Sequence, residues 1–370
     1  MIDQFARLTL SEKAAISIEK TEENYILDLA SQPSDPGGDG ILAVTGTNNS
    51  IRLHSRQNLA LKGKITGHQG VVSSVKFGTR EPALVYSSSL DATVRCWDTR
   101  DKNNQVHKYE GQGDERGMFL SLSVSCDDRT VCCGTEGIDG DTWIMFWDRR
   151  KPGIPIRRFT ECHNDDITQV QFHPSEVHKM ASGSTDGLIN IYDLRETDED
   201  DAIEMTLNTE SSVGKLGWKG PGGDNLYCIT HLETFHIWDS EGDLLAEHKN
   251  LKENFKELDY LVDCFEDGSS NFFLLAGSHN GDMQVLSLGD AKSTKCSTVG
   301  SLCKGHTDTV RSLSYSSSGC SLVTGGEDGM LCLWTPNNNG REPVTSHSKD
   351  SMKVKDKKSR TKPYSKGAKT

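Results

Sequence analysis

A five-residue ending recurs along this chain, and its regular spacing restricts the possible folds more than any other feature. Each strong copy is a run of apolar or β-branched residues that ends in an aromatic residue, usually followed by aspartate. The strong copies lie at residues 94–98, 144–148, 189–193, 235–239 and 331–335, and weaker copies lie at 51–55 and 283–287. Positions 54, 97, 147, 192, 238, 286 and 334 anchor the seven copies, 43 to 50 residues apart. This period predicts structural repeats that bury their apolar faces against their neighbours.

Other residues recur at fixed distances before the aromatic residue. In three repeats an aspartate stands six residues before it, a serine or threonine four residues earlier, and a histidine 22 or 23 residues before the aspartate. The three sets are His68, Ser87, Asp91 and Trp97; His163, Ser182, Asp186 and Tyr192; and His306, Thr324, Asp328 and Trp334. Asp followed by Gly or Ala favours a tight hairpin, and the β-branched and aromatic run after it favours a strand.

The period, the early histidine and the late Trp-Asp together resemble the WD-repeat family. The resemblance implies an all-β fold, a seven-bladed WD-repeat β-propeller with four strands in each blade. It also implies that each of the three sets forms a hydrogen-bonded network between a loop and the strands. In the second set, the Tyr192 hydroxyl would replace the indole N–H.

The remaining repeats depart from this pattern. In the fifth, sixth and first repeats, Leu232, Asn280 and Asn48 stand where the aspartate is expected. The third repeat keeps Asp141, but residues 135–140 lengthen its hairpin. We expect the blades without the aspartate to be held together by fewer internal hydrogen bonds.

The last repeat lacks a fourth strand, because the chain runs from Trp334 into Pro336, three asparagines and Gly340. Residues 14–20 show the alternation of a short strand, and we expect this N-terminal strand to close the ring, which removes exposed sheet edges. The predicted organisation is an N-terminal lead of residues 1–10, a propeller of residues 11–336 and a disordered basic tail of residues 337–370.

The charge of the chain is unevenly distributed. The net charge is −13, yet residues 335–370 hold ten Lys or Arg and three Asp or Glu, so this end carries +7 and the rest −20. An acidic body disfavours nucleic-acid binding, except weakly through the tail. Residues 353–360 could be a nuclear import signal or could only keep the chain soluble. No stretch approaches the roughly 18 apolar residues of a membrane span. We therefore expect a nuclear or cytoplasmic protein, and a monomer.

Catalysis is not expected from this sequence. Serine, histidine and aspartate can form a nucleophilic triad, but a catalytic site is built once, and these residues recur in separate repeats. The chain has no phosphate-binding loop, no HExxH helix and no Cys-x-x-Cys pair. The prediction is a protein that is not an enzyme, with no cofactor and no metal, that binds protein or peptide partners as WD-repeat scaffolds do.

One candidate surface is the face that carries the turns between second and third strands, where propellers often bind peptides. Aligning the repeats places these side chains on it: Val71, Ser73, Leu90, Met118, Leu120, Asp166, Thr168, Thr185, His231, His279, Thr309, Arg311 and Glu327. The run Met118, Phe119 and Leu120 is more apolar than contact with solvent requires. It could bind a peptide, or it could pack in a strand core.

A second candidate surface follows the third strands. Asp98 and Arg100, Asp148 and Arg150, and Asp193 and Arg195 each form a Trp/Tyr-Asp-x-Arg box. This resembles the box by which some WD proteins dock on the adaptor of cullin-4 ubiquitin ligases. The resemblance implies an alternative function, that of a substrate receptor, whereas the simpler interpretation is a surface ion pair that contributes little.

Overall fold

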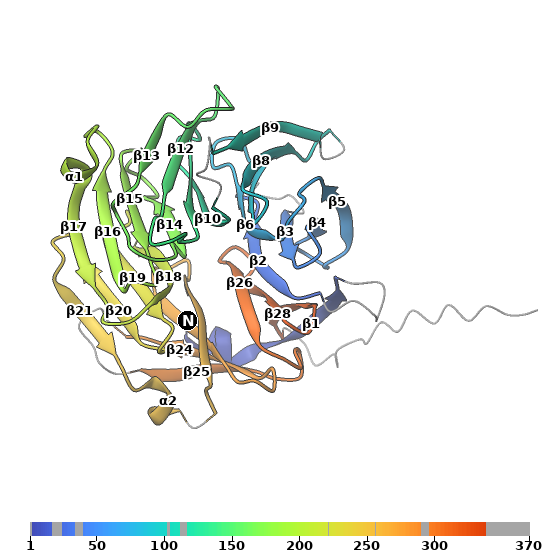
Figure 1. The fold of residues 1–370 in the computed structure, drawn as a ribbon. Coiled ribbons are helices and arrows are strands. Elements are labelled where there is room, and N and C mark those ends of the chain that lie inside the picture. Colours follow the sequence, from blue (N-terminus) through green and yellow to red (C-terminus); the bar gives the residue numbers. More distant parts are fainter. Residues whose placement is uncertain are drawn as a thin grey trace, which may run out of the picture.

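Seven four-stranded antiparallel sheets stand side by side around a central axis, following the chain from blue to red in Figure 1. The structure is a computed structural model that describes residues 2–16, 24–33, 40–101, 104–111, 117–220, 222–255, 257–289 and 296–337. We number the sheets as blades 1 to 7 in chain order. This architecture confirms the predicted seven-bladed β-propeller.

Blades 1 to 4 each take four consecutive strands. Blade 1 contains β2 (Ile26–Ser31), β3 (Ile41–Gly46), β4 (Ser50–Ser55) and β5 (Leu61–Thr66). Blade 2 contains β6 (Val72–Phe77), β7 (Leu84–Ser89), β8 (Thr93–Asp98) and β9 (Asn104–Glu110). Blade 3 contains β10 (Phe119–Val124), β11 (Thr130–Thr135), β12 (Ile144–Asp148) and β13 (Arg157–Phe159). Blade 4 contains β14 (Gln169–Phe172), β15 (Lys179–Gly183), β16 (Leu188–Asp193) and β17 (Ile203–Asn208).

Blades 5 and 6 repeat this order, and blade 7 does not. Blade 5 contains β18 (Val213–Lys219), β19 (Asn225–Thr230), β20 (Phe235–Asp239) and β21 (Leu244–His248). Blade 6 contains β22 (Tyr260–Glu266), β23 (Phe272–Gly277), β24 (Met283–Ser287) and β25 (Ser297–Leu302). Blade 7 contains β26 (Val310–Ser316), β27 (Ser321–Gly326), β28 (Met330–Pro336) and, from the other end of the chain, β1 (Leu8–Ala15). The short helices are η1 (Ile2–Arg7), α1 (Glu199–Ala202) and α2 (Leu251–Asn254).

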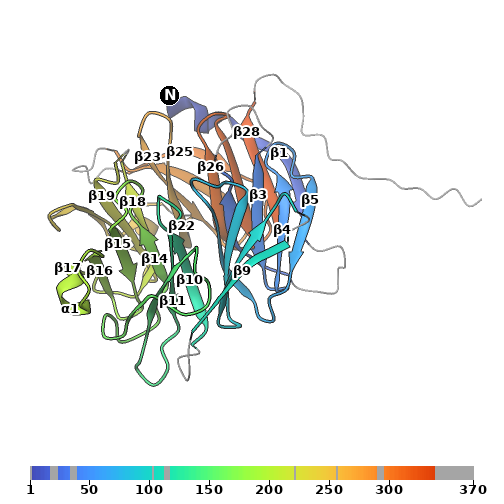
Figure 2. The same cartoon turned by 90° about the horizontal axis from the view of Figure 1, so that it is seen from above.

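The ring is closed by an N-terminal strand, as predicted, but by an earlier one. Strand β1 runs antiparallel to β28, with Leu8 opposite Pro336 and Ala15 opposite Met330, and the two lie side by side in Figures 1 and 2. Only residues 14 and 15 of the expected strand belong to it, and residues 17–23 lie outside the described part of the chain. The strand was predicted too late in the sequence. The reason is that β1 is an outermost strand in which only Leu8 is buried, so its sequence shows little alternation of apolar and polar residues.

The expected lead of residues 1–10 is likewise part of the propeller. Helix η1 places Phe5, which is 1% exposed, in the aromatic core shared by blades 6 and 7. The Phe5 ring lies 4.4 Å from the Phe273 ring and 5.7 Å from the Phe265 ring, measured between centroids. The folded unit therefore begins before residue 11. The predicted basic tail lies outside the described residues from residue 338 onward.

Apolar side chains fill the spaces between neighbouring blades. Between blades 2 and 3, for example, Tyr109 and Phe119 each place a ring 6.0 Å from Trp147. Cys96 and Cys133 belong to the same cluster, and all eleven cysteines are unpaired thiols. Burial raises the pKa of Cys96 to about 12, so this thiol packs as a small apolar group. No described helix is long and apolar enough to span a membrane.

Candidate functional site

The three recurring sets each form one hydrogen-bonded network. In blade 2, Trp97 Nε1 donates to Ser87 Oγ at 2.9 Å, and Ser87 Oγ lies 2.8 Å from His68 Nε2. Because the indole can only donate, the serine hydroxyl is free to donate to His68 Nε2, which leaves the Nδ1–H to donate to Asp91 Oδ2 at 3.0 Å. Burial lowers the pKa of His68, which favours this neutral form. Burial alone would raise the pKa of Asp91, but hydrogen bonds from His68 and Thr93 hold it well below its ordinary value.

Blades 7 and 4 repeat this geometry. His306 lies 2.8 Å from Thr324 Oγ1 and 3.1 Å from Asp328 Oδ1, and Trp334 Nε1 donates to Thr324 Oγ1 at 2.9 Å. In blade 4 His163 lies 2.7 Å from Ser182 Oγ and 3.0 Å from Asp186 Oδ2. The Tyr192 hydroxyl lies 2.9 Å from Ser182 Oγ and so replaces the indole N–H.

Each network connects a loop to the strands of its own blade. Ser87, Ser182 and Thr324 are all 0% exposed, so no substrate can reach their hydroxyls. Their positions between a loop and two strands fit a structural role and do not provide the accessible nucleophile that an acyl-transfer site requires.

Blade 3 lacks this network among its described residues. Asp141 is exposed, and the buried Trp147 Nε1 has no hydrogen-bond partner. The reason is visible in the strand register. Cys133 lies opposite Met145, at the place where Ser87 lies opposite Arg95 in blade 2, so no hydroxyl faces the indole. In blades 1 and 6, Asn48 and Asn280 instead accept hydrogen bonds from Ser50 and Ser278 within their own turns.

Blade 5 differs most, because its turn projects an apolar side chain into solvent. Leu232 is 71% exposed, whereas the aspartates at this position in blades 2, 4 and 7 turn inward to a histidine. The turn is closed by Glu233, whose φ of 60° is in the left-handed region. Leu232 does not belong to the apolar clusters that hold blade 5 against its neighbours.

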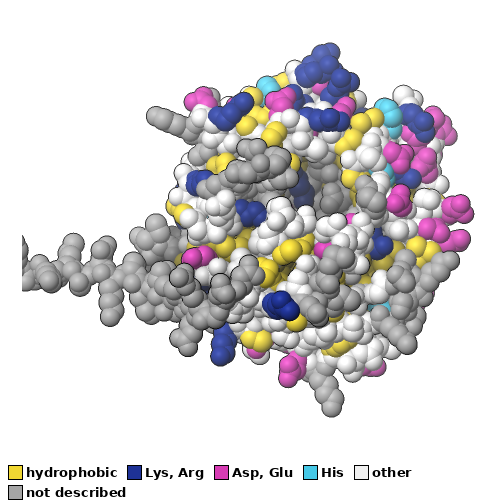
Figure 3. Space-filling view, turned by 180° about the vertical axis from the view of Figure 1, so that it is seen from behind, with side chains coloured by type: hydrophobic (Ala, Val, Ile, Leu, Met, Phe, Trp, Pro, Cys, Tyr) yellow, Lys and Arg dark blue, Asp and Glu magenta, His cyan; other side chains and the backbone are white. Residues whose placement is uncertain are grey.

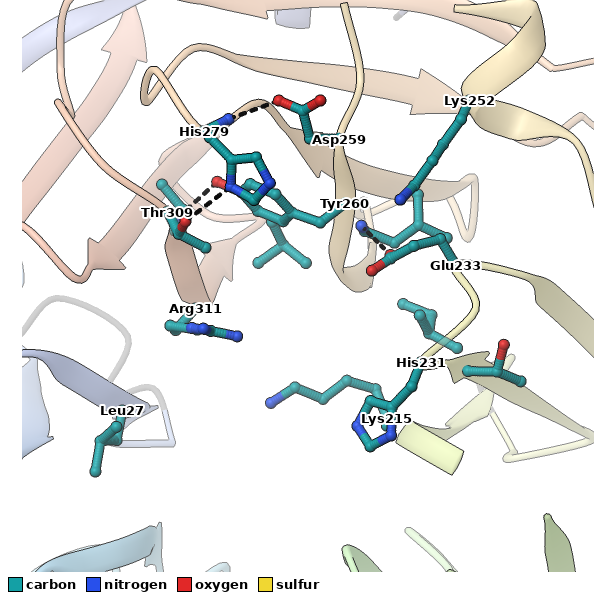
Figure 4. A pocket seen from close by; sticks show the side chains of 16 residues that line it. Leu27, Lys215, His231, Glu233, Lys252, Asp259, Tyr260, His279, Thr309 and Arg311 are labelled. Atoms are coloured by element: carbon teal, nitrogen blue, oxygen red, sulfur yellow. Dashed lines mark hydrogen bonds between the residues drawn. The ribbon is translucent and has the colours of Figure 1, made fainter. Parts of the chain in front are cut away.

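The chain neighbours of Leu232, His231 and Glu233, line a cavity of about 490 Å³, which is formed by blades 5, 6 and 7 and by Leu27 of blade 1. This volume is within the range of ligand sites in proteins. Figure 4 shows Lys215, His231 and Arg311 extending into the same open space, with Lys252 and Glu233 close together at its border. Sequence alignment of the repeats had placed His231, His279, Thr309 and Arg311 on this face, and the structure brings these four together.

Bulges in the innermost strands aim side chains at this cavity. In six blades the pairing of the first and second strands skips one residue near the start of the first strand. The skipped residues are Leu27, Ser73, Leu120, Gly214, Val262 and Arg311. Four of them line the cavity, and Ser73 and Leu120 line the channel below it. The sequence gives no signal for these bulges, because they depend on pairing between strands.

The carboxylates of the cavity are already engaged. Glu233 Oε2 accepts the Leu261 N–H at 2.5 Å, and Asp259 Oδ2 accepts the His279 N–H at 2.8 Å. Arg311 Nε donates to Glu327 Oε1 at 2.6 Å, and the Arg311 side chain is still 55% exposed. By contrast, neither Lys215 nor Lys252 makes an ion pair with any described residue. The repeat pattern did not mark Lys215, Lys252 or Glu233 as site residues.

A narrower space of about 190 Å³ continues along the central channel and shares Leu27 and Lys215 with the cavity. Its two carboxylates are also engaged: Asp28 accepts from Ser74 Oγ at 2.8 Å, and Asp263 accepts from the Tyr227 hydroxyl at 2.9 Å. Ser312, 4% exposed, lines this space, and its hydroxyl has no hydrogen-bond partner. Among the residues that the structure describes, no cluster of His, Cys, Asp or Glu could hold a metal ion.

The predicted apolar patch on blade 3 is divided by strand alternation. Phe119 is 0% exposed and packs against Trp147, so its inclusion in a binding surface was wrong. Met118 is 36% exposed at the loop, and Leu120 is the half-buried bulge residue that lines the channel. The patch is therefore not one surface, and only Met118 is open to solvent.

The three Asp-x-Arg boxes lie on blades 2, 3 and 4, just past the third strands. Each arginine binds its own aspartate through two nitrogens, as in the Arg150 Nε to Asp148 Oδ1 distance of 3.0 Å and the Nη2 to Oδ2 distance of 2.8 Å. Hydrogen bonds from Arg150 lower the pKa of Asp148 to about 2. In the structure the guanidinium fork is therefore occupied by the neighbouring aspartate, which is the surface ion pair of the simpler interpretation. The arginine side chains remain 71%, 66% and 68% exposed in chain order.

Comparison with known proteins agrees with the repeat pattern. The model of the WD domain, G-beta repeat matches residues 60–98, 153–193 and 296–335. WD repeat-containing protein 89 homolog of Dictyostelium discoideum is 30% identical over 92% of this chain and 92% of its own. This agrees with the degenerate first, fifth and sixth repeats, the acidic loop after the fourth repeat and the basic tail, by which nearly the whole chain resembles WD repeat-containing protein 89. WD repeat-containing protein GTS1 of Arabidopsis thaliana is 29% identical over 87% of this chain and 86% of its own. The guanine nucleotide-binding protein subunit beta of Zea mays is 25% identical over 62% of this chain and 59% of its own. On its repeats, its blades and these similarities, the chain belongs to the WD-repeat family.

Proposed function

We propose that this protein is a non-enzymatic scaffold that binds a protein or peptide partner on the face that carries the 490 Å³ cavity. WD-repeat proteins generally serve as interaction scaffolds, but a fold alone does not assign a function. The observation that supports the proposal is the combination of an open cavity, lined mainly by three blades, with the exposed Leu232, which lies in the chain between the lining residues His231 and Glu233. An apolar side chain next to unpaired polar groups is a typical anchor in protein interfaces.

Affinity purification of the full chain from cells, followed by mass spectrometry, tests this proposal. The test variant carries Leu232→Ser, Lys252→Ser and Arg311→Ser. The matched control carries Ile154→Ser, Lys151→Ser and Arg129→Ser on blade 3, where the side chains are also exposed. We expect the cavity variant to lose specific partners that the control retains. Identical partners for the parent and the cavity variant would refute this use of the face.

A second candidate function is docking on the adaptor of a cullin-4 ubiquitin ligase. What favours it is the equivalent placement of three largely exposed arginines on neighbouring blades. Figure 3 shows Lys and Arg side chains gathered at the edge of the molecule near blade 3. Because each arginine already binds an aspartate, docking would use its remaining N–H groups or the guanidinium plane.

The adaptor proposal predicts that Arg100→Ala with Arg195→Ala abolishes co-purification of the adaptor. The melting temperature should stay close to that of the parent, because exposed ion pairs contribute little to stability. If the parent chain never co-purifies with the adaptor, the ligase proposal is refuted, and the peptide-binding scaffold stands alone.

We further propose that the basic segment near the C-terminus directs the protein to the nucleus. The support is its excess of lysine and arginine over residues 349–370. Removing these residues from a fluorescent fusion should shift it toward the cytoplasm. An unaltered distribution would favour a role in solubility only.

A further inference from the structure

We infer that the basic segment of residues 349–369 docks on an acidic surface of its own propeller. This surface is formed by loops of blades 4, 5 and 6 on the face opposite the cavity. The occupant is thus a segment of this chain, and the surface is distinct from the one that we propose for partners. Three observations support docking: the distribution of charge over this face, the shape of the surface and the point where the chain leaves the propeller.

The negative charge of this face is concentrated on three neighbouring blades. The cavity face carries the turns between second and third strands, so the loops from first to second and from third to fourth strands lie on the opposite face. In blades 4, 5 and 6, the described residues of these loops hold ten carboxylates and one Lys or Arg, which is Arg195. The matching loops of blades 1, 2, 3 and 7 hold four carboxylates and seven Lys or Arg among their described residues.

Nearby cations do not neutralise this surface. The strand residues that flank its loops add three carboxylates and two lysines, and Arg157 of blade 3, which donates to the Leu194 carbonyl at 3.1 Å, adds one cation. Residues 290–295, outside the described part, add one aspartate and two lysines by sequence. The total is then fourteen carboxylates against six Lys or Arg. Within the described chain, no lysine or arginine forms an ion pair with any of the ten loop carboxylates, since Arg195 binds Asp193 instead.

The acidic surface is densest and most open on blade 4. Figure 3 shows Asp and Glu side chains gathered along the side of the molecule where Figure 1 places β17 and α1. Glu196, Asp200 and Asp201 are exposed there. A groove of about 320 Å³ is lined by Arg195 and Glu204, which flank this loop in the chain, and by residues 175–179. The groove gives an extended segment a recess beside the carboxylates.

The chain leaves the propeller on this same face. Because the third strands of equivalent blades run in the same direction, β28 ends at Pro336 on the face where β16 ends at Asp193. The Asn337 N–H donates to the Arg7 carbonyl at 3.0 Å, which fixes the point of exit. From Asn337 to Lys353 an extended chain spans roughly 50 Å, about the diameter of a folded unit of this size. The lysines that follow can therefore reach blades 4 to 6.

The charge of the segment is complementary to that of the surface. Residues 349–369 hold nine Lys or Arg and two aspartates. Single exposed ion pairs contribute little, but a tethered segment meets its site at an effective concentration of about 1 mM, so weak contacts suffice. The tether also favours this segment over a basic segment of another protein. Since salt screens exposed charges, docking should weaken as the ionic strength rises.

Carbodiimide cross-linking of the full chain, which joins a lysine directly to a carboxylate in contact with it, tests the inference. In the monomer fraction, mass spectrometry should find the lysines of residues 349–369 joined mainly to loop carboxylates of blades 4 to 6. In the variant Glu196→Gln with Asp200→Asn and Asp201→Asn, links to the remaining loop carboxylates should fall about threefold or more. The control Asp139→Asn with Glu253→Gln and Glu257→Gln removes the same charge from exposed loops of the cavity face and should leave these links unchanged.

Tryptic cleavage of the segment gives a second readout that does not depend on carboxylate chemistry. At low salt, cleavage within residues 349–369 should be about threefold or more slower in the parent and the control than in the blade 4 variant, and high salt should remove the difference. Equal cleavage of all three chains, or links spread evenly over both faces, would overturn the inference. Links found only in dimers would assign the surface to a second copy of the chain and would overturn docking within one chain.

Discussion

At the scale of single residues, the hydrogen-bonded sets explain why the same few side chains recur at fixed spacing. Within the blade, the aromatic side chain donates a hydrogen bond to the hydroxyl, the hydroxyl bonds to the histidine, and the histidine bonds to the aspartate. Each member is costly to remove, because the group left behind is buried without a partner.

The first prediction concerns coupling inside one network. A double-mutant cycle of Asp328→Ala with His306→Ala should give a coupling free energy of about 1–3 kcal/mol in chemical denaturation. The control cycle pairs Asp328→Ala with His107→Ala in β9 of blade 2, and should be additive within about 0.5 kcal/mol. Zero coupling between Asp328 and His306 would contradict the network in blade 7.

The second prediction concerns pH. Burial lowers the pKa below the ordinary value of 6.5 for His54, His68, His107, His236 and His248. The unfolded chain therefore binds protons near pH 6.5 that the folded chain does not, so the free energy of unfolding should fall as the pH is lowered through that value. Each such histidine contributes at most about 1.4 kcal/mol per pH unit.

Urea denaturation at a series of pH values measures this slope, and His248→Gln should make it shallower by removing one titrating group. Stability that rises on acidification through pH 6.5 would contradict the neutral, buried state of these histidines.

At the scale of elements, blades are tied to one another by carboxylates that reach across the gap. Asp128 of blade 3 is 2% exposed and accepts the backbone N–H groups of Thr79, Arg80 and Glu81 in blade 2 at 2.7 to 2.8 Å. One side chain thus satisfies three donors of a neighbouring loop, which fixes one blade against the next.

Asp128→Ala should therefore lower the free energy of unfolding by about 1–3 kcal/mol. The matched control is Asp127→Ala, since among the described residues Asp127 bonds within its own turn, to Ser125 and Arg129. It should cost less than about 1 kcal/mol. Equal effects of the two substitutions in thermal or urea unfolding would refute the tie between the blades.

Ring closure can be tested in the same way. Phe5→Ala should cost about 3–5 kcal/mol, because the ring fills the core between blades 6 and 7. Deleting residues 2–15 should do more, since it exposes the edge of β28, and the truncated chain should aggregate. A truncated chain that stays soluble with an unchanged melting temperature would contradict closure by β1.

At the scale of the whole molecule, the sequence predicts the features that recur among the repeats, but not the features that occur once. Seven third strands follow from the spacing of their anchors, and the three networks follow from residues at fixed distances in one repeat. The position of β1 could not be predicted, because a strand paired on one side needs few apolar residues. The cavity could not be predicted either, since strand bulges aim Leu27 and Arg311 at it. Phe119 was assigned to the wrong side of its strand. Successive residues of a strand point to opposite sides, but Met118, Phe119 and Leu120 are all apolar, so their sequence does not show which of them is buried.

The central functional proposal is that partners bind the face of the propeller that carries the cavity. Backbone hydrogen exchange of the full chain, with and without a partner purified with it, measures this most directly. We predict protection of the turn at residues 230–233 and of the strand starts at 259–262 and 309–311, which line the cavity. Protection confined to residues 98–101, 148–151 and 193–196, where the Asp-x-Arg boxes lie, would contradict the claim.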